Sequence, residues 1–151
     1  MAVKPIPEGY HTVTPYLVVK GAAGLIDFLK QAFDAEEVVR MPGKDGTVGH
    51  AEVRIGDSMI MLADAQAEYP AKPHMICLYV EDADATYQRA IAAGATSIKE
   101  PADQFYGDRS GGVTDASGMQ WWISTHIEDI PPEELAKRAA AYKEQHKDEC
   151  S

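Results

Sequence analysis

The chain has 151 residues, of which 45% are apolar and 25% charged, a composition typical of one globular domain and not of a disordered or fibrous chain. Acidic residues outnumber basic ones 24 to 14, giving a net charge of −10, so we expect neither a nucleic acid nor an anionic membrane surface as a partner. The opening residues, MAVKPIPEGY, contain no apolar signal segment, and no stretch reaches the roughly 18 apolar residues of a membrane span, so we expect a cytoplasmic protein.

The first half of the chain predicts a strand, a helix and three further strands. The apolar residues of segment 21–33 recur at the spacing of one helical face: Ala22, Leu25, Ile26, Leu29 and Phe33. Strands are expected at 14–19, 36–41, 48–55 and 58–63, where apolar or alternating runs occur. The pair Gly56-Asp57 between the last two strands is typical of a two-residue hairpin turn.

The same order of elements recurs 61 residues later. A helix is predicted from the N-cap Asp82 to Gly94, and strands are predicted at 75–80, 96–99, 105–114 and 119–124. We therefore predict two strand–helix–strand–strand–strand modules, at about 10–65 and 72–126, within one domain of residues 1–128. In the tail, 129–151, Pro131-Pro132-Glu133-Glu134 precedes strong helix formers, which predicts a C-terminal helix.

Five short motifs support the assignment of this repeat to a known group: Thr14-Pro15-Tyr16-Leu17, Gly49-His50-Ala51-Glu52, Gly56-Asp57-Ser58, Phe105-Tyr106-Gly107-Asp108-Arg109 and Thr125-His126-Ile127-Glu128-Asp129. With two βαβββ modules, the chain resembles the vicinal oxygen chelate superfamily of glyoxalases, bleomycin-resistance proteins and dioxygenases, and most closely its PhnB-like subgroup. The resemblance implies an α+β fold in which the modules form a U-shaped mixed sheet around a cavity. It also implies a homodimer.

Metal-dependent enzymes of this superfamily take one ligand from each of four strands. By resemblance, those positions are Thr14, Met61, Met75 and Trp122 here. Catalytic sites for divalent metals use imidazole and carboxylate ligands, and this set contains neither. We therefore expect no metal and no other cofactor, and interpret the chain as a metal-independent small-molecule-binding protein.

Strand alternation places aromatic and thioether side chains on the cavity face, a lining that suits a flat aromatic or cationic ligand. Eight residues are the expected ligand contacts: Thr14, Tyr16, Met61, Met75, Tyr79, Phe105, Arg109 and Trp122. Two alternatives remain open at this point. The cavity could be filled by its own side chains, and Arg109 could fix the hairpin or a subunit contact instead of a ligand.

His50 and Glu52 alternate onto the same cavity face of the third strand. They are candidate catalytic residues, with His11 as a further candidate, because a histidine beside a carboxylate can bind a metal or exchange protons. The alternative function is therefore a lyase, isomerase or dioxygenase of the same superfamily, with a displaced divalent metal site around His50 and Glu52 or with metal-free acid–base chemistry. The same alternation is also typical of the polar face of a half-buried sheet.

Overall fold

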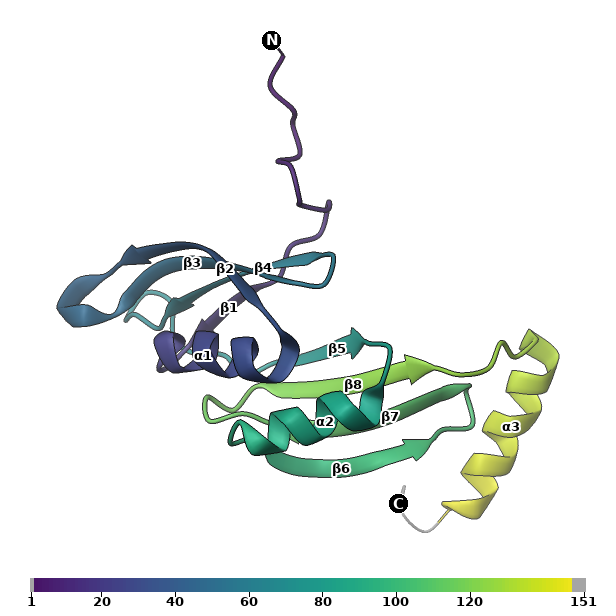
Figure 1. Cartoon of the computed structure of the whole chain (residues 1–151). Coiled ribbons are helices and arrows are strands. Elements are labelled where there is room, and N and C mark those ends of the chain that lie inside the picture. The colour runs from purple at the N-terminus through teal and green to yellow at the C-terminus, as the bar shows by residue number, and fades with distance from the viewer. Residues whose placement is uncertain (1, 148–151) are drawn as a thin grey trace.

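The computed structural model describes residues 2–147, and it contains two βαβββ modules followed by a helix (Figure 1). The first module consists of β1 (Tyr16–Val19), α1 (Ala22–Phe33), β2 (Glu36–Pro42), the short 3-10 turn η1 (Lys44–Gly46), β3 (Val48–Ile55) and β4 (Ser58–Asp64). The second consists of β5 (Met75–Tyr79), α2 (Ala83–Ala92), β6 (Thr96–Asp103), β7 (Asp108–Thr114) and β8 (Gln120–His126), and α3 (Pro132–Gln145) ends the described chain. The predicted α+β fold with its C-terminal helix is confirmed.

The strands form two four-stranded sheets, in the orders β1-β4-β3-β2 and β5-β8-β7-β6. The edge strands β1 and β5 run parallel to β4 and β8, and the other pairs are antiparallel. The predicted repeat is visible in the register, because Tyr16 pairs with Met61 and, 61 residues later, Cys77 pairs with Trp122. We refer to these sheets as the first and the second sheet.

Helices α1 and α2 pack against each other, and each covers one face of its own module's sheet, α1 the first sheet and α2 the second. Leu17 and Val19 of β1 are each only 2% exposed on this helix-covered face, as the alternation of a half-buried strand requires. The two modules share one core, in which the ring centroids of Phe33 in α1 and Trp121 in β8 are 5.3 Å apart. In addition, Arg89 of α2 forms an ion pair with Asp34 at the end of α1. The opposite face of each sheet, here called its open face, is not covered by α1 or α2.

Each module holds the start of its helix with a side chain from the end of its last strand. In the first module, Asp64 Oδ1 accepts hydrogen bonds from the backbone N–H groups of Gly21 and Ala22, both at 2.9 Å. Asp64 Oδ2 accepts a third, from the N–H of Val48, at 2.8 Å. In the second module, Thr125 Oγ1 accepts from the N–H of Ala83 at 2.9 Å. The contacts to Gly21, Ala22 and Ala83 satisfy donors that have no partner within the helix.

Helix α3 packs against the turn between β6 and β7. The guanidinium of Arg138 donates to both carboxylate oxygens of Glu128, at 2.8 and 3.0 Å, and the Phe105 ring lies 4.9 Å from that of Tyr142. Residues 148–151 of the predicted tail lie outside the described residues. No helix within residues 2–147 is both long enough and apolar enough to cross a membrane.

Predicted element boundaries differ from the observed ones mainly at two strands. Strand β1 begins at Tyr16 instead of residue 14, so Thr14 precedes the sheet. Strand β7 begins at Asp108 instead of residue 105, because Phe105 and Tyr106 belong to the turn that follows a longer β6. The predicted hairpin at Gly56-Asp57 is confirmed, since Ile55 pairs with Ser58.

Candidate functional site

The open face of the first sheet brings together four of the residues selected from the sequence. Tyr16 of β1 is the register partner of Met61 of β4, which is in turn the partner of Glu52 of β3. His50 lies two residues from Glu52 and therefore on the same face. These four residues, which were predicted to face the cavity, thus lie on one face of the first sheet.

Three of these side chains form a hydrogen-bond chain. The Tyr16 hydroxyl lies 3.1 Å from His50 Nδ1, and His50 Nε2 lies 3.3 Å from Glu52 Oε2. The side chains of His50 and Glu52 are only 26% and 17% exposed, whereas Tyr16 is 46% exposed. The phenol is therefore the solvent-facing end of the chain and the carboxylate its more buried end.

A cavity of about 490 Å³ opens beside Tyr16. It is lined by Tyr16, Val18, Gly49, Ala63, Asp64, Gln66 and Tyr69. Tyr69 comes from the segment between the modules, which folds back on β1 through hydrogen bonds from the Ala65 and Lys72 N–H groups to the carbonyls of Val19 and Val18. The sequence interpretation missed Tyr69, although a single aromatic residue within the polar segment 64–73 is a signal that could have found it.

The open face of the second sheet carries a separate group of predicted contacts, namely Met75, Tyr79 and Trp122. Met75 and Tyr79 are 58% and 68% exposed. The Trp122 ring lies against Gly112, where an added Cβ would come within 2.9 Å of the ring carbons. Gly112 therefore leaves the space in which this indole lies flat on the sheet.

A buried carboxylate links Tyr79 to the end of β8. The Tyr79 hydroxyl donates to Asp108 Oδ2 at 2.7 Å, and this hydrogen bond raises the pKa of Tyr79. His126 lies between Asp108 Oδ1 at 2.9 Å and Asp129 Oδ1 at 2.7 Å. Hydrogen bonds to Asp108 and Asp129 raise the pKa of His126 above its usual value. Asp108 was not among the predicted site residues.

Three predicted ligand contacts lie away from both groups. Thr14 precedes β1, and its hydroxyl donates to the His11 carbonyl at 3.4 Å. Phe105 packs against Tyr106 and α3. Arg109 points to the helix-covered face of the second sheet, where it donates to Asp84 of α2 and to Asp103. The structure thus favours the hairpin-fixing role of Arg109 over ligand contact, because two carboxylates already occupy its guanidinium.

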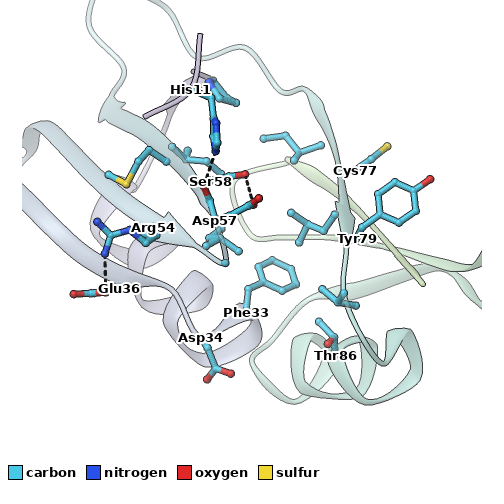
Figure 2. Close-up of a pocket in the computed structure, with 18 of the residues that line it drawn as sticks. His11, Phe33, Asp34, Glu36, Arg54, Asp57, Ser58, Cys77, Tyr79 and Thr86 are labelled. Carbon is cyan, nitrogen blue, oxygen red and sulfur yellow. Dashed lines mark hydrogen bonds and ion pairs between the residues drawn. The ribbon is translucent and has the colours of Figure 1, made fainter. Parts of the chain in front are cut away.

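His11 lies apart from His50, in a groove between the β3–β4 hairpin and β5 (Figure 2). Its Nε2 is 2.9 Å from the Asp57 carbonyl oxygen. The groove has a volume of about 890 Å³, and two basic residues that line it are engaged by acidic ones, Arg54 by Glu36 and Arg89 by Asp34. The Cys77 and Tyr79 side chains point away from Phe33 at the centre of the view. His11 therefore does not join His50 and Glu52 in one site.

Comparison with known sequences identifies the family. The profile of the Glyoxalase/Bleomycin resistance protein/Dioxygenase superfamily matches residues 10–123. The chain belongs to this superfamily. It is 38% identical over 134 residues to protein Mb0911c of Mycobacterium bovis (strain ATCC BAA-935 / AF2122/97), an alignment that covers 82% of this chain and 88% of that protein.

Solved structures with the same fold include the following three. TioX from Micromonospora sp. ML1 has a TM-score of 0.68 at 24% identity and covers 78% of this chain and 99% of its own. TnmS3, an antibiotic binding protein from Streptomyces sp. CB03234, has a TM-score of 0.63 at 19% identity, with 83% and 98% covered. The PhnB protein from Bacillus cereus has a TM-score of 0.59 at 17% identity, with 76% and 99% covered. At these identities the likeness establishes the fold alone.

The residues expected at the metal-ligand positions do not fit a divalent metal. Thr14, Met61, Met75 and Trp122, which the resemblance predicts at those positions, offer a hydroxyl, two thioethers and an indole, which are poor ligands for such ions. Within residues 2–147, no group of three or more His, Cys, Asp or Glu side chains is arranged to hold a metal ion. His50 and Glu52 supply only two such groups.

Proposed function

We propose that this superfamily member is a metal-independent small-molecule-binding protein of the PhnB-like kind, and that its ligand occupies the cavity on the open face of the first sheet. The observation that carries the proposal is the cavity of about 490 Å³ between the aromatic side chains of Tyr16 and Tyr69. Drug-sized ligands bind in cavities of about 300–1,000 Å³ that are largely apolar and contain a few polar groups. The antibiotic-binding protein TnmS3, which shares the fold, supports the same class of function.

The lining of this cavity favours a flat aromatic ligand that is neutral or cationic. Two tyrosine rings offer surfaces for stacking and for cation–π contact, and Val18 and Ala63 add apolar surface. Asp64 is the only charged residue in the described lining, which contains no lysine, arginine or histidine. The net charge of −10 adds a general attraction for cations.

The test is a titration of the full chain with flat aromatic compounds, for example cationic proflavine and anionic anthracene-2-sulfonate, followed by isothermal titration calorimetry. We expect proflavine to bind and Val18→Trp, which fills the cavity, to abolish that binding. The matched control is Val38→Trp, because Val38 is exposed on β2 and does not line the cavity. Equal loss of binding in both variants, or equal affinity in Val18→Trp and the unaltered protein, would contradict the proposed location.

We also propose a homodimer in which a second copy covers the exposed apolar groups. Met75 and Tyr79 are exposed on the open face of the second sheet. The N-terminal end of the segment before β1 extends away from both sheets (Figure 1), and within this segment Val3 is 90% and Val13 82% exposed. Light scattering coupled to size-exclusion chromatography should give about twice the chain mass of 16.4 kDa. A monomer mass at every concentration would contradict this assembly.

The second candidate function is an enzyme that uses His50 and Glu52, and the observation in its favour is their 3.3 Å contact. Elemental analysis of protein purified without chelator distinguishes it from a metal-independent binding protein. We expect no stoichiometric metal. One equivalent of metal that disappears in both His50→Ala and Glu52→Gln would instead establish the displaced metal site.

A further inference from the structure

The direction of the hydrogen-bond chain on the first sheet is set by its buried end. An ionised carboxylate can only accept hydrogen bonds, so Glu52 Oε2 requires a proton on His50 Nε2, 3.3 Å away. In a neutral imidazole the other nitrogen is then an acceptor. His50 Nδ1 therefore accepts the Tyr16 O–H, at 3.1 Å. The Tyr16 hydroxyl thus donates its only proton to His50, and its oxygen presents only lone pairs to the solvent.

We propose that Tyr16 is the specificity-determining residue of the ligand cavity and selects aromatic ligands that carry a hydrogen-bond donor, a hydroxyl or a protonated amine on or beside the ring. Glu52 acts through His50 as a positioning residue. This inference rests on the proposed function, since it concerns the ligand of the same cavity. It adds a chemical class to that ligand, because a ligand carbonyl or ether oxygen meets only the lone pairs of Tyr16.

The other polar groups near Tyr16 do not change this preference. Gln66 and Tyr69 also line the cavity, but an amide and a hydroxyl can each donate or accept, so they favour neither kind of ligand. Both oxygens of Asp64, which lines the cavity, are engaged by the backbone N–H groups of Gly21, Ala22 and Val48. Arg54, the basic residue of β3, donates to Glu36 at 3.1 Å, on the β2 side of the sheet. The Tyr16 oxygen is therefore the acceptor that the cavity offers through a fixed hydrogen-bond chain.

The probes are 2-naphthol, which carries a donor, and 2-methoxynaphthalene, which has the same ring system without one. Their affinities for the full chain are measured by calorimetry and expressed as a ratio. Tyr16→Phe removes the acceptor and keeps the ring, so its ratio is the baseline for differences in hydration of the two probes. One hydrogen bond should raise the ratio of the unaltered protein above that baseline by roughly three- to tenfold.

Two further variants distinguish an effect of the hydrogen-bond chain on selectivity from general damage to the cavity. Glu52→Gln can either donate or accept at His50 Nε2, which makes both directions of the chain accessible, so its ratio should fall toward the Tyr16→Phe baseline while 2-methoxynaphthalene still binds. Tyr69→Phe removes a phenol from the same cavity outside the chain and should keep the ratio of the unaltered protein.

The outcomes separate this inference from the proposed function. If both probes bind the unaltered protein with the baseline ratio, the cavity binds aromatic ligands and the selection by Tyr16 is wrong. If Glu52→Gln keeps the full ratio, Glu52 does not set the direction of the chain. If proflavine binds and neither naphthalene probe does, this inference is wrong and the proposed function stands. If none of the three compounds binds, both fail.

Discussion

Asp64 and Thr125 occupy equivalent positions at the ends of β4 and β8, and each accepts a hydrogen bond from the backbone at the start of its module's helix. They are 61 residues apart, which is the period of the repeat. The aspartate accepts two such bonds and a third backbone bond from Val48 of β3, whereas the threonine accepts one. Burial of Asp64 opposes ionisation, but the N–H groups of Ala22, Val48 and Gly21 outweigh it, so the pKa of Asp64 is lower than usual.

Replacement of Asp64 by alanine should therefore destabilise the protein by about 2 kcal/mol, the upper end of the range for loss of a helix cap. The free energy of unfolding is measured by urea denaturation followed by circular dichroism. The comparison is Thr125→Val, which removes one hydrogen bond and keeps the volume, and should cost about 1 kcal/mol. An equal cost of the two substitutions would show that the additional contacts of Asp64 contribute nothing.

The position of His126 between two carboxylates predicts a specific pH dependence. Because its pKa is raised in the folded protein, the charged imidazole stabilises the fold fully below the unfolded pKa of about 6.5. That contribution is lost as the pH rises through the higher folded pKa. NMR titration should show His126 titrating at higher pH than a solvated histidine. Asp108→Asn should lower the pKa of His126, and an unchanged pKa in this variant would contradict the structure.

Gly107 should tolerate no side chain. Its φ is +93°, and an added Cβ would collide with the carbonyl oxygen of Glu128, a residue of the connection between β8 and α3. The control is Gly46, which has a φ of +78° and open space around its Cβ position. Gly46→Ala should cost about 1 kcal/mol for its backbone conformation alone, and Gly107→Ala at least about 2 kcal/mol more because the collision adds to a similar cost. Similar thermal unfolding midpoints for both variants would contradict this packing.

Substitution of Arg109 tests whether this residue has a structural role or contacts the ligand. Arg109→Met should lower the free energy of unfolding only slightly, because exposed ion pairs contribute little, and should leave the affinity for 2-naphthol unchanged. Calorimetry and urea denaturation on the same preparation measure both quantities. A tenfold loss of affinity at unchanged stability would show instead that Arg109 contacts the ligand.

Local patterns were sufficient to predict the modules and the faces of most strands. The side-chain period of a strand is two, so His50 and Glu52 could be placed on one face of β3 without knowledge of any other element. The helical stripe from Ala22 to Phe33 likewise depends only on residues within one helix. Both predictions are confirmed because the information that decides them lies within a few residues of chain.

Tertiary structure alone decided which of these faces meet. The contact between Tyr16 and His50 spans 34 residues and exists because β4 lies between β1 and β3. Tyr69 reaches the cavity because its loop folds back on β1. Arg109 lies on the helix-covered face because it pairs with Thr125 of β8, two residues from the buried Ile123, and a single residue of register decides the face of every side chain in a strand. Residue order determines the alternation of side chains, whereas strand pairing and strand limits depend on packing between distant segments.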